Sequence, residues 1–227
     1  PLPRDPPDPQ QYLGVAASPE DASIGASGRD KLIGFLAHQQ ECLGKVGIPL
    51  GASLETCHVL SCHQQPRARA QTRKQVALMA ATHSAVALDP FAGATPDAIA
   101  NAALARIEAD FAAGRPFLVY STAEPAHVAE VQAKLGRDRA AALIEQAFGV
   151  LAAKLVDRGV RRLVVAGGET AGAVVQALGV ESLAIGPAID PGVPWTTARG
   201  RTTLALALKS GNFGSDDFFT KSLAMLP

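Results

Sequence analysis

Short apolar runs alternate with longer amphipathic segments along the chain from about residue 85 onward. The apolar runs predict strands at 85–90, 116–121, 162–166, 182–186 and 202–208. Segments whose apolar residues recur at helical spacing predict helices at 95–114, 138–158, 170–178 and 215–226. Apolar strands that alternate with helices are typical of a parallel sheet covered on both faces. We therefore expect an α/β domain of three layers, α/β/α, with a largely parallel sheet.

Residues that favour helix ends support these boundaries. Thr95 and Pro96 form a typical N-cap and first helical position, and Gly114 follows the last turn of the same helix. Asp216 is expected to cap the final helix. The proline-rich segment 187–195 is expected to be a loop between two strands.

The amino-terminal part of the chain lacks this regular pattern. Five of the first nine residues are proline, so residues 1–25 are expected to form a disordered tail. Residues 30–44 have a helical pattern, whereas residues 45–75 show no clear one. We expect the tail to be followed by a segment at 26–60 and a folded domain at 61–227. The chain does not begin with methionine, which suggests a fragment or a processed chain.

Charge and cysteine content narrow the classes of function. The 21 basic and 21 acidic side chains cancel, so we expect neither nucleic acid nor an anionic membrane as a partner. The apolar stretches are shorter than the roughly 18 residues that a membrane span needs. Three cysteines, without the spacing of a disulfide framework, are typical of a reducing compartment. The cytoplasm is the expected location.

The junction after the strand at 162–166 carries the first candidate site. It consists of Gly167, Gly168, Glu169 and Thr170. Ligands of open α/β sheets bind at the carboxyl ends of strands, where glycines admit a ligand to the backbone and helix N–H groups attract anions. Thr170 can cap the helix or bind a phosphate oxygen, and Glu169 can accept a hydroxyl or hold magnesium through water. An ordinary turn with glycine at its corner is the alternative.

A second glycine loop follows the strand at 202–208. It contains Lys209, Ser210, Gly211, Asn212 and Gly214. Neither loop is a Walker A motif, because no G-x-x-x-x-G-K-[ST] occurs in the chain. Two glycine loops at the ends of separate strands favour a nucleotide that bridges them, with Lys209 as a candidate charge partner.

Other chemical features have ordinary explanations. The segment 57–63 contains two cysteines and two histidines, but their spacing is poor for zinc, so we expect no metal site within the protein. The basic run at 66–74 has no interleaved aromatic residues, which favours a solvated helix start over nucleic-acid binding. Trp195 is expected to pack against the domain rather than stack on a base, and His127 to have a capping or surface role.

Three long motifs carry a resemblance to a known family. They are "RRLVVAGGETAGAVVQALGV" (161–180), "IGPAIDPGVPW" (185–195) and "LALALKSGNFGSDDFF" (204–219). Together they resemble the carboxyl-terminal, nucleotide-binding domain of the four-carbon acid sugar kinase family, and within it the 3-oxo-tetronate 4-kinases. The resemblance implies phosphorylation of the terminal hydroxyl of a four-carbon sugar acid, with ATP and Mg2+ as cofactors. It also implies that Gly167, Gly168, Glu169 and Thr170 form the ATP-contacting loop and that Gly211 lies in the second contact.

The chain departs from the family pattern at two places. The family's G-S-C-S-x-A-T-x-x-Q stretch, whose last serine contacts ATP, corresponds here to "LSCHQQPRARAQ" (60–71). The related positions are Ser61, Cys62, Arg69, Ala70 and Gln71. The family's aspartate-rich, "ADDLTG"-like motif for the sugar acid has no counterpart, so the segment 26–60 is expected to be a remnant of that amino-terminal domain.

These departures keep several interpretations open. A kinase needs an acceptor site and a general base, and no catalytic residue is identified here. A catalytically silent nucleotide-binding fragment, or one half of a split kinase, is therefore the alternative to an active kinase. A domain like that of sugar-phosphate isomerases is a third interpretation. Whether the chain forms a homo-oligomer is left open.

Overall fold

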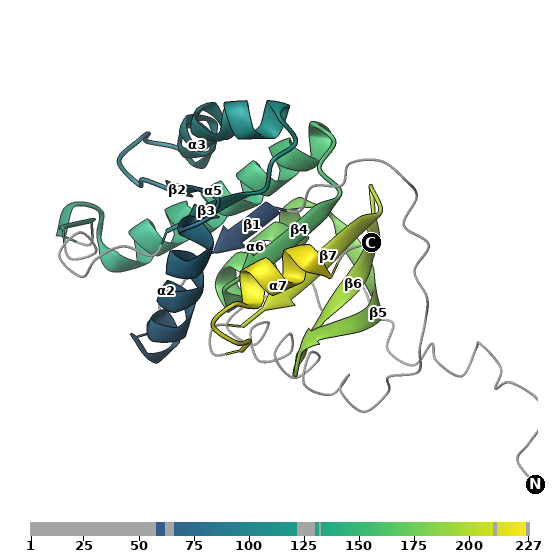
Figure 1. Cartoon of the computed structure of the whole chain (residues 1–227). Coiled ribbons are helices and arrows are strands. Elements are labelled where there is room, and N and C mark those ends of the chain that lie inside the picture. Colours follow the sequence, from purple (N-terminus) through teal and green to yellow (C-terminus); the bar gives the residue numbers. More distant parts are fainter. Residues whose placement is uncertain (1–57, 62–65, 122–129, 132, 211–212, 226–227) are drawn as a thin grey trace, which may run out of the picture.

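The computed structural model describes residues 58–61, 66–121, 130–131, 133–210 and 213–225 (Figure 1). The expected tail at 1–25, the segment 26–57 and the expected helix at 30–44 lie outside these residues. Gly211 and His127 also lie outside them. The predictions made for those parts of the chain therefore stay predictions.

Seven strands form one sheet within the described residues, in the order β2-β3-β1-β4-β7-β6-β5. Five neighbouring strands are parallel: β2 (Ser84–Ala87), β3 (Phe117–Tyr120), β1 (His58–Ser61), β4 (Arg162–Ala166) and β7 (Leu204–Lys209). β6 (Val193–Gly200) pairs antiparallel with both β7 and β5 (Val180–Asp190). The largely parallel sheet expected from the apolar runs is confirmed.

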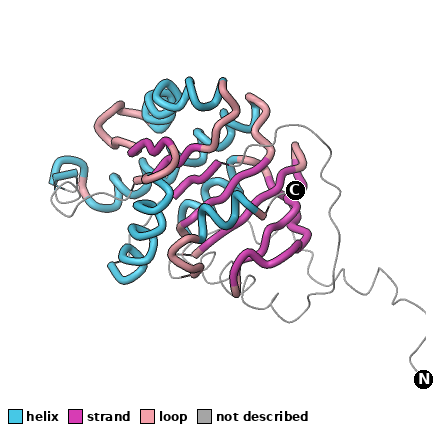
Figure 2. The backbone as a smooth tube through the Cα atoms, viewed as in Figure 1, coloured by secondary structure: helices cyan, strands magenta, loops and turns pink. Residues whose placement is uncertain are grey.

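Helices cover both faces of this sheet (Figures 1 and 2). α2 (Pro66–Ala80) and α7 (Phe218–Ala224) pack on one face, and α3 (Pro96–Ala112), α5 (Arg137–Asp157) and α6 (Gly168–Ala177) pack on the other. Side chains of β4 alternate between the two cores. Leu163 and Val165 lie on the α5 face, whereas Val164 and Ala166 lie on the α2 face. The three-layer α/β/α arrangement is confirmed.

The predicted boundaries of two long helices agree closely with the structure. α3 begins at Pro96, and the Thr95 side chain accepts a hydrogen bond from the Ala98 N–H at 3.2 Å. This bond satisfies one of the N–H groups that the first turn of a helix leaves unpaired. α5 spans Arg137–Asp157, within one residue of the predicted 138–158 at each end.

The prediction of a loop at 187–195 is wrong. β5 continues to Asp190 and β6 begins at Val193, so most of this segment forms an antiparallel hairpin. Its prolines are tolerated because Pro187 lies on an edge strand, at a register irregularity between Ile185 and Ala188. Pro194 precedes Trp195, where the pairing of β6 with β7 begins.

Two predicted helix starts also need correction. α6 begins at Gly168, two residues before Thr170, and Gly167 is its N-cap. α7 begins at Phe218 after Asp217, and Asp216 does not cap it, because its carboxylate accepts a hydrogen bond from Gln71 of α2 instead. No helix in the described ranges is long and apolar enough to cross a membrane.

Candidate functional site

The carboxyl ends of β1, β4 and β7 lie side by side. Ser61 pairs in register with Ala166, and Ala166 pairs with Lys209. The chain leaves β1 toward the N-terminus of α2 and leaves β4 directly into the N-terminus of α6. The N–H groups of a helix N-terminus attract anions, so this edge of the sheet favours a negatively charged ligand.

The two glycine loops begin next to each other at this edge. The Gly167 N–H donates a hydrogen bond to the Lys209 carbonyl oxygen at 2.8 Å. Gly167 has a φ of 122°, which disfavours residues with a side chain. A Cβ built on Gly168 would meet nothing within 4 Å. The backbone at the start of α6 is therefore open to a ligand.

The two remaining residues of the first predicted loop differ in exposure. Glu169, in the first turn of α6, is half-buried. Thr170 is 1% exposed and contributes to the buried side of the helix. Gly167 is the N-cap, so Thr170 does not cap the helix, which was one of the two roles open to it.

Lys209 is a buried cation at the end of β7. Its side chain is on the α2 face, where its Nζ lies 5.9 Å from the centre of the Phe218 ring and 3.2 Å from the Ser210 carbonyl oxygen. Lys209 is 1% exposed, and burial lowers its pKa to about 8. A negatively charged ligand at this edge would favour the protonated amine.

Ser61 adds a second polar group to the same row. Parallel strands in register direct paired side chains to the same face, so Ser61 and Lys209 flank the small Ala166 on the α2 face. The Ser61 Oγ is buried and has no hydrogen-bond partner among the residues that the structure describes. Buried hydroxyls are normally paired, so this group fits an additional ligand or water.

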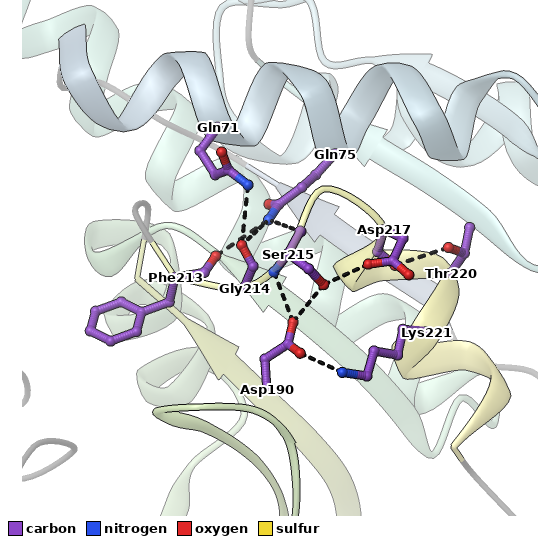
Figure 3. A network of polar contacts seen from close by, with 9 residues as sticks. All are labelled: Gln71, Gln75, Asp190, Phe213, Gly214, Ser215, Asp217, Thr220 and Lys221. Atoms are coloured by element: carbon purple, nitrogen blue, oxygen red, sulfur yellow. Dashed lines mark hydrogen bonds and ion pairs between the residues drawn. The ribbon is translucent and has the colours of Figure 1, made fainter.

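The second glycine loop is held from α2 (Figure 3). The Gln75 Nε2 lies 3.3, 3.2 and 2.8 Å from the carbonyl oxygens of Phe213, Gly214 and Ser215. The Gln71 Nε2 donates to the Gly214 carbonyl at 3.1 Å and to Asp216 at 2.9 Å. One side of the loop is therefore fixed by two amides of one helix.

Asp190, at the end of β5, holds the same loop from another direction (Figure 3). It accepts hydrogen bonds from the Ser215 N–H at 2.8 Å and from the Ser215 hydroxyl at 2.9 Å. It also forms an ion pair with Lys221 of α7. Burial opposes ionisation of Asp190, but the bonds from Lys221 and Ser215 outweigh it and lower the pKa of this carboxyl.

The other candidates from the sequence have structural roles or lie outside the described residues. Trp195 is 2% exposed and packs in the core on the α2 face, as predicted. Arg73 and Lys74 are exposed on α2, as expected for a solvated helix. Three of the four cysteines and histidines in the segment 57–63, at positions 57, 62 and 63, are not described, and no group of potential metal ligands occurs in the described ranges.

The roles of Gln75 and Asp190 could not be predicted from these residues individually. A glutamine on a basic helix and an aspartate before Pro191 carry no chemical signal alone. Both lie far from the second glycine loop in the sequence. The sequence signal for a functional role was that Asp190 lies within the family motif 185–195 and that Gln71 is the last residue of the stretch 60–71.

Comparisons with known proteins identify relatives of this chain. Residues 68–219 match the family described as nucleotide-binding C-terminal domain. A 3-oxo-tetronate kinase of Cupriavidus necator is 55% identical over 144 residues, covering 63% of this chain and 32% of the relative. A 3-oxo-tetronate kinase of Methylobacterium radiotolerans is 40% identical over 227 residues, covering 95% of this chain and 51% of the relative.

A solved structure shows a similar arrangement. The crystal structure of a Haemophilus influenzae protein of the DUF1537 family is 36% identical, with a TM-score of 0.62, and the match covers 75% of this chain and 40% of that one. The chain thus spans about half the length of these relatives or less. Since the sequence match covers most of the sheet and its helices, including both glycine loops, the chain belongs to the family of nucleotide-binding C-terminal domains.

Proposed function

We propose that this chain binds ATP at the carboxyl edge of β4 and β7 and supplies the nucleotide-binding part of a sugar-acid kinase. The observation that carries the proposal is the hydrogen bond from Gly167 to Lys209, which joins the starts of the two glycine loops. The relatives named 3-oxo-tetronate kinase support 3-oxo-tetronate as the acceptor. The phosphorylated group would be the terminal hydroxyl of this four-carbon acid.

Phosphoryl transfer requires mainly that the phosphates be positioned and their charge neutralised. We assign the backbone N–H group of Gly168 to the phosphates, because a ligand can approach the main chain there, whereas the Gly167 N–H already donates to the Lys209 carbonyl oxygen. Lys209 supplies the positive charge, and Gly211 is proposed as the contact from the second loop. Thr170 would contribute its backbone rather than its buried side chain.

Glu169 fits a role next to magnesium. The residue is half-buried in the first turn of α6, and Mg2+ prefers carboxylate oxygens and retained waters. Magnesium would neutralise phosphate charge when bound. Glu169 would orient the coordinated waters, so that the phosphates stay against the backbone of α6.

The sugar-acid site and the general base remain unassigned to residues of this chain. The relatives are two to three times as long as the matched part, so their additional residues can supply both. The same observation supports the alternative of a nucleotide-binding module that is inactive by itself.

Dependence on ATP and the odd number of cysteines favour a cytoplasmic location.

Calorimetry with ATP, ADP and AMP in the presence of magnesium tests the proposal. We expect ATP and ADP to bind more tightly than AMP, because both loops are suited to phosphate. Equal affinity for AMP, or no binding, would contradict the assignment of the loops.

Substitution of Gly168 locates the site. Gly168→Val should weaken ATP binding at least tenfold, about 1.4 kcal/mol, by blocking backbone approach. A Cβ at position 168 would meet nothing within 4 Å, so the Gly168→Val variant should fold. Gly172→Val is the matched control, because Gly172 lies one turn farther along α6 and is equally open. Unchanged affinity in folded Gly168→Val would place the phosphates elsewhere.

A further inference from the structure

Two segments that are distant in the sequence, α2 and the end of β5, contact the loop at Gly214 and Ser215 (Figure 3). Gln71 and Gln75 reach this loop from α2, and Asp190 reaches it from the end of β5. The contacts from α2 bridge 139 to 143 residues of sequence, and those from Asp190 bridge 25 residues. We call Gln71, Gln75 and Asp190 the loop clamp.

The Gln75 amide determines which way the loop carbonyls point. Gln75 is 1% exposed, and its Nε2 faces three carbonyl oxygens, that of Ser215 at 2.8 Å. The opposite amide orientation would place oxygen against oxygen, so the donor must face the loop. A buried carbonyl that loses its donor is costly, which favours this one arrangement.

The direction of the carbonyls also decides where the loop N–H groups point. In a trans peptide, the C=O of one residue and the N–H of the next point in opposite directions. The Phe213 carbonyl faces α2, so the Gly214 N–H points away from α2. An anion binds N–H groups and is repelled by carbonyl oxygens, so a phosphate that binds this loop would approach the Gly214 N–H, on the side away from the carbonyls.

Asp190 fixes the far end of the loop. It is 7% exposed, and its carboxylate accepts hydrogen bonds from both the N–H and the hydroxyl of Ser215. Bonds to an ionised acceptor are stronger than bonds between neutral groups. The ion pair with Lys221 keeps the carboxylate charged and connects it to α7. Ser215 is therefore held on one side by Gln75 and on the other by Asp190.

We propose that the loop clamp is a set of positioning residues for nucleotide phosphates, which hold residues 213–215 with their carbonyls turned toward α2. The proposal rests on the proposed function, since it names the residues that shape the second loop of that site. None of the three clamp residues is expected to touch the nucleotide.

Gln75→Met and Asp190→Ala test this role. Both remove loop contacts, and Met keeps the length of the glutamine side chain. Gln176→Met is the matched control, since Gln176 is an exposed residue near the end of α6. Asp190→Asn should restore much of the function, because its amide oxygen still accepts from Ser215. Gln71→Met, at a half-buried position, replaces Gln75→Met if that variant does not fold.

Two measurements separate positioning from general stability. Without nucleotide, hydrogen exchange of residues 213–217 should become about tenfold faster in the clamp variants, while exchange in β4 and β7 stays unchanged. The Kd for ATP with magnesium should rise about tenfold, whereas the Kd for adenosine, which has no phosphate, should not change. The control variant should show neither effect.

The outcomes distinguish this proposal from the proposed function. If the wild-type chain binds ATP but the clamp variants bind it equally well, the positioning role is overturned and the nucleotide site stands. Unchanged loop exchange in the variants would also overturn the role. If the wild-type chain does not bind ATP, the proposed function fails and the assignment of a ligand to the clamp fails with it.

Discussion

Gly214 lies directly against the ring of Phe218. A Cβ built on Gly214 would be 2.7 Å from the Phe218 Cδ2 and 2.8 Å from its Cγ. The backbone of Gly214 also has a φ of +82°, which side chains rarely permit. The second glycine loop is thus packed onto the first residue of α7 in a conformation that depends on glycine.

Gly214→Ala should therefore destabilise the protein by about 1–3 kcal/mol, since both the ring and the backbone must shift. Urea denaturation measures this change in the free energy of unfolding. Gly136→Ala is a useful comparison, because Gly136 has a φ of +78° but a Cβ there would meet nothing within 4 Å. A loss no larger at Gly214 than at Gly136 would show that the contact with Phe218 is unimportant.

His58 should make the stability depend on pH. Its ring stacks on Phe117 with the centroids 3.8 Å apart, and burial lowers its pKa from 6.5 to about 4. The unfolded chain then binds a proton that the folded chain does not, so the free energy of unfolding falls as the pH drops from 6.5 to about 4. This group should account for a loss of about 3 kcal/mol.

Denaturation of the wild-type protein and of His58→Phe over this pH range measures the contribution. The variant keeps a ring against Phe117 but cannot bind the proton, so its stability should fall less on acidification. Other titrating groups affect both proteins equally. Parallel pH profiles for the two would contradict the assigned role of His58.

Lys209 should make ATP binding depend on pH in the alkaline range. The amine is protonated below its pKa of about 8 and loses its charge above it. Affinity for ATP should thus be higher one pH unit below this pKa than one unit above it, by about tenfold. Lys209→Met should bind ATP more weakly and without this dependence. Calorimetry at both pH values tests this, and equal pH dependence in the variant would exclude Lys209 from the site.

The 227-residue chain alone should phosphorylate 3-oxo-tetronate little or not at all, even with ATP bound. Positioning two reactants together can contribute roughly 7–11 kcal/mol to barrier lowering, and only the ATP side is assigned here. A coupled ADP-release assay measures turnover. Addition of the amino-terminal part of a relative, such as the kinase of Cupriavidus necator, should restore it. Turnover of several per second by the chain alone, about that of complete kinases, would reveal an acceptor site within it.

Elements whose own residues carry the signal were predicted closely. The apolar run at 162–166 is β4, and the pair Thr95–Pro96 begins α3 through a bond that the Thr95 side chain makes locally. The glycines after β4 likewise lie at the carboxyl edge of the sheet, where the sequence predicted them. These features depend on neighbours in the sequence, so a local pattern is sufficient to predict them.

α2 was less clear because its buried face is partly polar. The buried positions Thr72, Gln75, Val76 and Met79 have helical spacing, but two of them are not apolar. The apolar periodicity is therefore weakened, and the exposed basic residues dominate the segment. The buried Gln75 side chain donates hydrogen bonds to a loop 138–140 residues away in the sequence. No local pattern can indicate such a distant contact.

The sequence by itself determined the layers of the fold, the parallel part of its sheet and the glycine loops, because apolar period, capping residues and backbone freedom are local properties. Tertiary structure alone decided the antiparallel hairpin of β5 and β6, the burial of Lys209 and the clamp on Gly214 and Ser215. Each of these depends on which strands become neighbours in the sheet. Strand neighbours determine which side chains are buried, which charges lose their hydration and which distant donors reach unpaired carbonyls. These properties therefore follow from the tertiary structure and cannot be predicted from local sequence.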